Sequence, residues 1–160
     1  MSSKVLVALR VAAPPERAFA VFTEDIGLWW RDNPLFRFTP RSPGVLSFEA
    51  GEGGRLVEIL PGGRVFEIGR ITCWAPPARL SFGWRQASFH PEQQTQVDVR
   101  FEPLGEETRI TVEHHGWESV PQAHVARHHL PDLVFMRRHG EWWQALLVAY
   151  KARLSQAKGP

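Results

Sequence analysis

The sequence predicts an α+β protein in which a curved, seven-stranded antiparallel sheet wraps around a long C-terminal helix. Three observations support this fold class. Apolar and polar residues alternate with period two between residues 45 and 117, as in antiparallel strands joined by short turns. Apolar residues recur at steps of three and four from Pro131 to about Ala157, which predicts a helix. A helix of about 25 residues is roughly 37 Å long, so its apolar stripe needs an equally long partner such as a curved sheet.

The N-terminal part is predicted to form one strand followed by two short helices. Lys4 to Val11 carries apolar side chains on both faces, which indicates a strand that is covered on both sides. Pro14 and Pro15 are suited to open a helix, and a short apolar stripe follows them. Thr23 is expected to cap a second short helix, from Glu24 to about Trp30.

Residues 31–44 are predicted to form an ordered loop, because prolines and a glycine alternate there with large apolar side chains. Two interpretations of this loop stay open. It is either the lid of a cavity beside Trp29 and Trp30, or a surface loop pinned by Phe36 and Phe38.

Six further strands complete the predicted sheet. They cover residues 45–50, 55–60, 64–74, 79–86, 95–102 and 108–115, mostly with turn-forming glycines and prolines between them. One face of this meander is apolar and the other is polar. Residues 118–130 are irregular and predict a loop with one helical turn before the long helix.

Length and composition predict one soluble domain over residues 1–160, with its core at about 4–155. The formal net charge is only +2 and no basic run is present, so we expect no nucleic-acid partner. No apolar stretch is long enough to span a bilayer, and no signal peptide is recognisable, which predicts a cytoplasmic location. The single cysteine, Cys73, cannot form an internal disulfide.

The polar residues do not predict a metal centre or covalent catalysis. His124 and His128 are four residues apart, but no second metal-binding motif accompanies them, so we expect no metal and no cofactor. The serines lie in no nucleophile elbow, and an enzyme is the less favoured interpretation. His114 shares a strand face with Ile110 and Val112, and is either a buried neutral histidine or a ligand contact.

The sequence contains seven tryptophans and ten phenylalanines but only one tyrosine. Because these side chains are bulky, this aromatic content predicts a roomy interior. Trp142 and Trp143 either fill the core or help to wall a cavity between helix and sheet. A glycine in the middle of the helix, Gly140, costs up to about 1 kcal/mol relative to alanine and indicates the close approach of a strand or a ligand. The residues expected to face the cavity and bind a ligand are Trp29, Trp30, Phe36, Phe48, Phe66, Phe82, Trp84, Val99, Phe101, His114, Trp117, Trp142, Trp143 and Leu146.

Five short segments carry a resemblance to a known family, and the resemblance covers about residues 4–155. They are Val11–Phe19, Trp29-Trp30, Pro76–Trp84, His115–Trp117 and Glu141–Leu147. Their order and spacing resemble the activator of Hsp90 ATPase homologue 1-like (AHSA1-like) family of the START-like, or SRPBCC (Bet v 1-like), superfamily. This resemblance implies a helix-grip fold. The chain departs from the family pattern at Trp74 and Ala75, where a carboxylate is common before the paired prolines.

The resemblance and the aromatic pattern together predict a small-molecule-binding module, as a monomer or homodimer. Its hydrophobic or aromatic ligand would lie in a cavity between the sheet and the C-terminal helix. One alternative that the resemblance implies is a polyketide cyclase- or aromatase-like enzyme, with His114, Glu67 and Arg70 as its polar groups. Another is a stress-response protein associated with an Hsp90-type chaperone. The family name implies that partnership, but the sequence itself does not support it.

Overall fold

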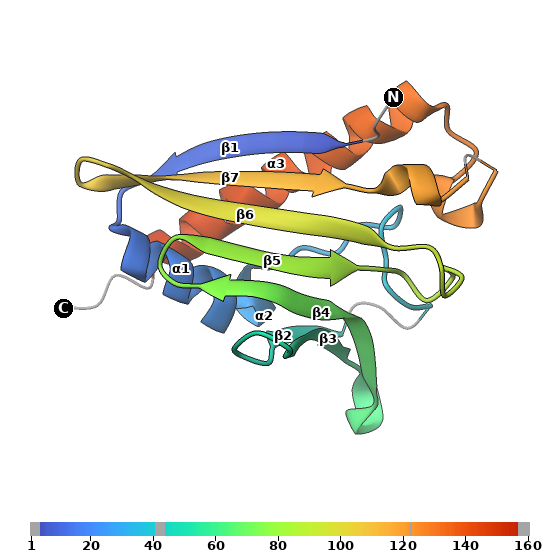
Figure 1. The fold of residues 1–160 in the computed structure, drawn as a ribbon, viewed down its shortest axis with the longest axis horizontal. Helices are drawn as coiled ribbons and strands as arrows, with labels where there is room; N and C mark the ends of the chain where they lie inside the picture. The colour runs from blue at the N-terminus through green and yellow to red at the C-terminus, as the bar shows by residue number, and fades with distance from the viewer. Residues whose placement is uncertain (1–3, 41–43, 122, 157–160) are drawn as a thin grey trace.

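One curved antiparallel sheet dominates the computed structural model, which describes residues 4–40, 44–121 and 123–156 (Figure 1). Its strands are β1 (Val5–Val11), β2 (Val45–Phe48), β3 (Arg55–Ile59), β4 (Val65–Ala75), β5 (Arg79–Trp84), β6 (Thr95–Leu104) and β7 (Glu107–His115). The spatial order is β1-β7-β6-β5-β4-β3-β2, so the first strand pairs with the last one. The predicted seven-stranded sheet is confirmed, and its strand ends differ from the predicted ones by at most two residues.

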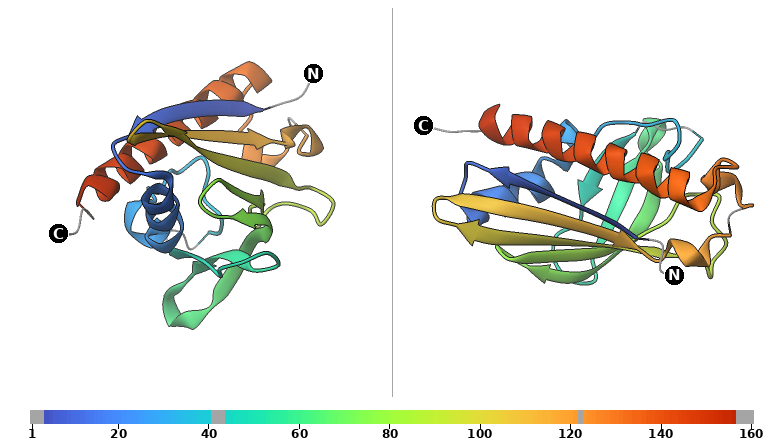
Figure 2. Two further views of the ribbon diagram at one scale, coloured as in Figure 1. Left: turned by 60° about the vertical axis from the view of Figure 1, so that its left-hand side comes forward. Right: turned by 90° about the horizontal axis from the view of Figure 1, so that it is seen from above.

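Three helices cover the concave side of this sheet. They are α1 (Pro15–Glu24), α2 (Ile26–Trp29) and α3 (Asp132–Gln156), and single 3₁₀ turns occur at Pro61–Gly63, Trp117–Ser119 and Val125–Arg127. Figure 2 shows α3 lying along one face of the sheet, and this helix packs against β1, α1 and α2. The predicted helix end at Ala157 lies outside the described residues. None of the helices in the described ranges is long and apolar enough to cross a membrane.

The predicted cap at Thr23 is wrong. Thr23 lies inside α1, and its buried hydroxyl donates a hydrogen bond to the carbonyl oxygen of Phe19 at 2.9 Å. A threonine hydroxyl within a helix can bond back to the carbonyl four residues earlier, which satisfies its proton without ending the helix. Asp25 takes the position before α2 instead.

The loop after α2 is anchored to the end of β5. Phe36 and Phe38 are both buried, at 2% and 4% exposure. The backbone N–H of Ala87 donates to the carbonyl oxygen of Phe38 at 2.7 Å, and the side-chain amide of Gln86 donates to that of Arg37 at 2.8 Å. The described part of this segment therefore favours the second interpretation, a surface loop pinned by Phe36 and Phe38.

Candidate ligand-binding site

Aromatic rings in mutual contact occupy the space between α3 and the sheet. The ring of Trp84 lies at the centre, with its centroid 4.1 Å from that of His114 and 5.3 Å from that of His139. Trp143 and Trp117 pack edge to face on the same indole at 6.1 and 6.3 Å. Each of these five side chains is at most 2% exposed. This part of the molecule is therefore a packed core.

A hydrogen-bond chain runs through the packed core and fixes its histidine tautomers. The hydroxyl of Thr95 donates its only proton to the carbonyl oxygen of Trp84 at 2.9 Å, so it accepts the bond from Nε2–H of His114 at 2.8 Å. Nδ1 of His114 then carries no proton. It accepts from Nε2–H of His139 at 2.8 Å and from the indole N–H of Trp143 at 3.2 Å.

The two histidines of this hydrogen-bond chain, His114 and His139, are neutral at neutral pH. Burial removes water from the charged imidazolium, which lowers the pKa of His139 to about 3 and the pKa of His114 well below its ordinary value. The neighbouring charge of Arg127 lowers the pKa of His139 further. His114 is thus buried and hydrogen-bonded, which favours the first of its two interpretations.

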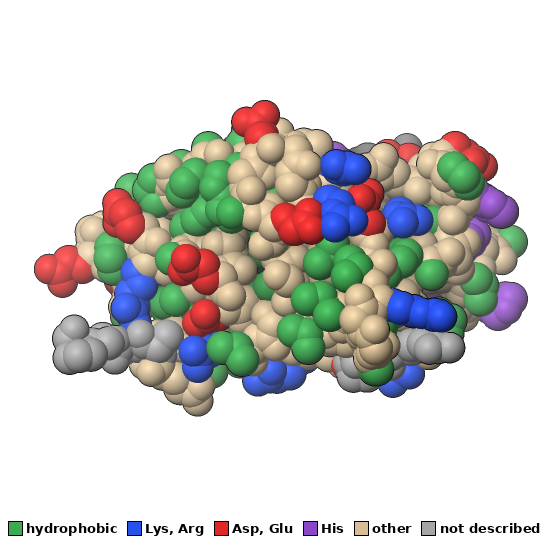
Figure 3. All heavy atoms as spheres, turned by 90° about the horizontal axis from the view of Figure 1, so that it is seen from below, with side chains coloured by type: hydrophobic (Ala, Val, Ile, Leu, Met, Phe, Trp, Pro, Cys, Tyr) green, Lys and Arg blue, Asp and Glu red, His purple; other side chains and the backbone are tan. Residues whose placement is uncertain are grey.

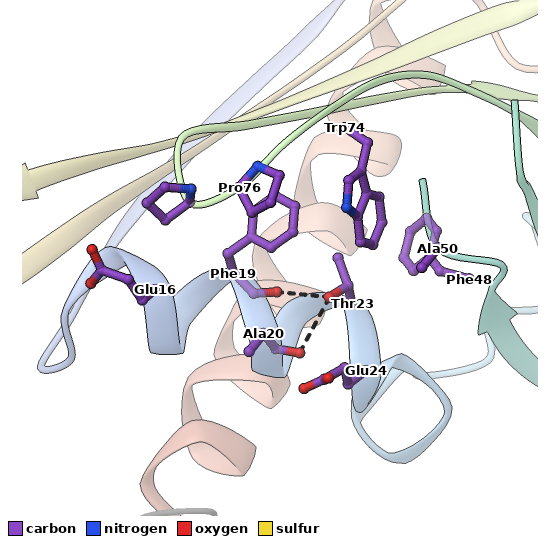
Figure 4. A pocket seen from close by; sticks show the side chains of 10 residues that line it. Glu16, Phe19, Ala20, Thr23, Glu24, Phe48, Ala50, Trp74 and Pro76 are labelled. Carbon is purple, nitrogen blue, oxygen red and sulfur yellow. Dashed lines mark hydrogen bonds between the residues drawn. The ribbon is translucent and has the colours of Figure 1, made fainter. Parts of the chain in front are cut away.

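A pocket of about 420 Å³ lies elsewhere, between α1 and the sheet (Figure 4). This site, called here the α1 pocket, is lined by Glu16, Phe19, Ala20, Thr23, Glu24, Phe48, Ala50, Trp74, Pro76 and Pro77. The first five come from one face of α1, because steps of three and four bring helical residues to the same side. The others come from the end of β2 and the residues just after it, from the end of β4, and from the β4–β5 turn. Three segments far apart in the sequence thus build one apolar pocket.

The side chains of the α1 pocket combine aromatic surfaces with a few polar atoms. Phe19 packs edge to face on Trp74, with ring centroids 5.2 Å apart, and also contacts Phe101 of the core at 5.2 Å. The indole N–H of Trp74 has no acceptor among the described residues, so it can donate to a ligand. Seen from below, the side of the molecule that carries α1 exposes hydrophobic side chains with both acidic and basic ones among them (Figure 3).

The structure distributes the fourteen predicted ligand-binding residues over several environments. Phe48 lines the α1 pocket. Trp30, Phe36 and Trp142 line a smaller hollow of about 40 Å³, and Phe66 packs under the guanidinium of Arg85 at 4.7 Å. The other nine are buried in the core: Trp29, Phe82, Trp84, Val99, Phe101, His114, Trp117, Trp143 and Leu146.

Sequence reasoning missed most of the α1 pocket. In the sequence, Trp74 stands out only as a departure from the family pattern, in which a large apolar side chain replaces a charged one. A second signal was the spacing of Glu16, Ala20 and Glu24, which places them on a face of α1 other than its buried stripe.

The three polar residues proposed for a catalytic site do not share an accessible site. His114 has no exposed surface. Arg70 is largely exposed and lies 3.6 Å from a carboxylate oxygen of Glu67 in a surface ion pair. Among the described residues, no group of three histidine, cysteine, aspartate or glutamate side chains is placed to hold a metal ion.

Comparisons with known proteins agree with the architecture. The Aha1 dimer from Colwellia psychrerythraea is 19% identical, with a TM-score of 0.63 over 98% of this chain and 98% of that chain. An Hsp90 activator from Plasmodium falciparum is 18% identical, with a TM-score of 0.64 over 96% of each chain. At this level of identity, both show the fold alone.

A more similar sequence belongs to Txn09, an anthrahydroquino-γ-pyrone synthase. It is 32% identical over 72% of this chain and 83% of its own, with a TM-score of 0.50. A search of curated proteins returned no match. A family model described as activator of Hsp90 ATPase homolog 1-like protein matches residues 12–145. The chain therefore belongs to the activator of Hsp90 ATPase homolog 1-like family.

Proposed function

We propose that this protein binds a hydrophobic or aromatic small molecule in the α1 pocket. The observation that carries the proposal is the pocket itself, which has a volume of about 420 Å³ and an apolar lining. Small-molecule sites are typically apolar pockets of roughly 300–1,000 Å³ with a few polar groups that set orientation. The rings of Phe19, Phe48 and Trp74 offer an aromatic ligand edge and face contacts, each worth about 0.5–1.5 kcal/mol beyond the burial of area.

The α1 pocket is favoured over the space beneath α3 because it needs no rearrangement. A ligand under α3 would have to displace a buried ring such as Trp84 or Trp143. Removing a large aromatic side chain from a core costs about 3–5 kcal/mol, and displacement of a ring would oppose binding by a comparable amount. A pocket that is already formed avoids this cost.

A titration with the neutral fluorescent probe N-phenyl-1-naphthylamine tests the proposal. We expect saturable binding to the unmodified protein, and about five- to thirtyfold weaker binding after Trp74→Ala, because about 1–2 kcal/mol of ring contact is lost. Phe66→Ala is the matched control, since it removes a partly exposed ring from the same strand outside the pocket. Equal affinity of Trp74→Ala and the unmodified protein, or no saturable binding at all, would contradict the proposal.

Cyclisation of an aromatic polyketide is a second candidate function for the same pocket. The identity of 32% with an anthrahydroquino-γ-pyrone synthase favours it. A proton-transferring group must reach the substrate, which the buried His114 cannot do without opening the core. In this candidate Glu16 or Glu24 transfers the proton. Turnover by the unmodified protein that is lost in the Glu16→Gln/Glu24→Gln double variant would show catalysis and disprove simple binding. Turnover that survives in the double variant would exclude these two residues as the proton-transferring groups.

Association with an Hsp90-type chaperone stays a prediction. Its support is the description of the family and the fold shared with the activator from Plasmodium falciparum. No feature of the α1 pocket bears on it. Co-purification of the two proteins at micromolar concentration would support the association, and the absence of a complex would remove it.

A further inference from the structure

We propose that the α1 pocket selects ligands that carry a cationic group, such as a protonated amine, over neutral or anionic ligands of the same shape. This inference rests on the proposed function, because it names the class of ligand that the same pocket would take. It is carried by the charge and hydrogen-bonding character of the lining residues.

Two carboxylates are the only charged groups that line the pocket in the described part of the chain. Glu16 and Glu24 stand eight residues apart on α1, about 12 Å along the helix axis. Figure 4 shows Glu16 at the end of the pocket near Pro76 and Glu24 at the other end of the helix face, beyond Ala20 and Thr23. Neither glutamate forms an ion pair with another residue in the described part of the chain. Their charges are therefore available to a ligand.

The arginines nearest in sequence to the other lining residues have acidic partners. Arg55 binds Glu49, beside the lining residue Phe48, through two bonds of 2.8 and 2.7 Å. Arg79, close to the prolines of the pocket, lies 3.8 Å from Asp98.

The basic residues closest to the helix carboxylates point elsewhere. Arg17, the chain neighbour of Glu16, lines a different hollow together with Lys151. Among the described residues, no lysine or arginine lines the pocket, so the charge of its described lining is negative.

The uncharged groups of the pocket also favour positive charge. The hydroxyl proton of Thr23 points to the backbone oxygens of Phe19 and Ala20, at 2.9 and 3.3 Å, so only its oxygen lone pairs remain for a ligand. The π-face of Trp74 attracts a cation placed over it. One side-chain donor, the indole N–H of Trp74, remains for a ligand oxygen. The recognised ligand is therefore an aromatic or aliphatic body with an ammonium group.

Three ligands of one shape test the inference: 2-naphthylmethylammonium, 2-naphthylmethanol and 2-naphthoate. We expect the cation to bind about three- to tenfold more tightly than the alcohol, and the anion more weakly than the alcohol, because two exposed carboxylates each contribute modestly. Glu16→Gln/Glu24→Gln should bring the three affinities to within about twofold. Raising the salt concentration should reduce the preference for the cation in the unmodified protein.

Glu92→Gln/Glu118→Gln is the matched control, because it removes the same charge from exposed positions that line no pocket described above. It should keep the order of affinities. Equal affinities of the unmodified protein for the alcohol and the cation would overturn the inference and leave the proposed function intact. An equal loss of preference in the control variant would overturn it too, since net charge would then suffice. If none of the three compounds binds, the proposed function itself fails.

Discussion

The α1 pocket and the packed core beneath α3 are built from the same kinds of residue but differ in closure. In the core, the ring of Trp84 has six aromatic or imidazole neighbours within 6.3 Å, and hydrogen bonds link three of them, His114, His139 and Trp143. In the pocket, Trp74 and Phe19 meet edge to face, and a space of about 420 Å³ remains open beside them. Aromatic side chains alone therefore do not indicate where a ligand fits.

The two helices explain this difference. The long helix α3 extends over 25 residues and presents eight buried side chains to its surroundings. The helix α1 has ten residues and contacts β2, β6 and β7, whereas the prolines of the β4–β5 turn lie across the pocket from it. A short helix covers less of the sheet than a long one. The open volume lies between α1, the end of β2 and the β4–β5 turn.

The strongest expected contrast is in stability. Trp143→Ala should lower the free energy of unfolding by about 3–5 kcal/mol, because it empties a buried site and removes a donor to His114. Trp74→Ala should cost less than half as much, because this side chain is only partly buried. Urea unfolding of the two variants measures both values. Equal losses would mean that the two regions are packed alike.

Acid should weaken the core before it affects the pocket. The pKa values of His114 and His139 are lower in the folded chain than the ordinary value of about 6.5. The unfolded chain therefore binds more protons below that pH, and stability falls as the pH drops toward about 3. Two such groups predict a loss of about 2 kcal/mol between pH 6 and pH 5, above the range in which Asp98 and Glu49 titrate.

Urea unfolding at the two pH values tests this prediction with a pair of variants. His139→Phe should remove about half of the pH dependence, because one of the two buried bases is gone. The exposed residue His90 provides the control, and His90→Gln should leave the dependence unchanged. An unaltered dependence in His139→Phe would contradict the assignment of the acid sensitivity to the core.

The smallest expected effect concerns the contact between α3 and β1. A methyl group added at Gly140 would meet Val5 at 3.7 Å, an ordinary van der Waals distance. Gly140→Ala should therefore raise the free energy of unfolding by up to about 1 kcal/mol through helix propensity. A loss of stability in urea unfolding would show that helix and strand are too close for the extra methyl group.

The sequence was sufficient for the fold but not for the site, and particular residues show why. Strand alternation and the stripe of α3 depend on local spacing, so the order of elements could be predicted. Whether Trp84 faces a void or another ring depends on His114, His139 and Trp143, which the chain brings together from distant segments. Periodicity carries no information on that packing. Trp74 and Glu16 meet in one pocket only because β4 ends beside α1.

The central claim is that a ligand binds in the α1 pocket and not beneath α3. NMR spectra with assigned backbone amide and indole N–H signals, recorded during a titration with 2-naphthylmethylammonium, test it most directly. The indole signal of Trp74, identified by its loss in Trp74→Phe, should shift together with the amides of α1. The indole signals of Trp84 and Trp143 should stay in place. Shifts confined to Trp84, Trp143 and the amides of α3, with Trp74 unaffected, would place the ligand beneath the long helix and contradict the account.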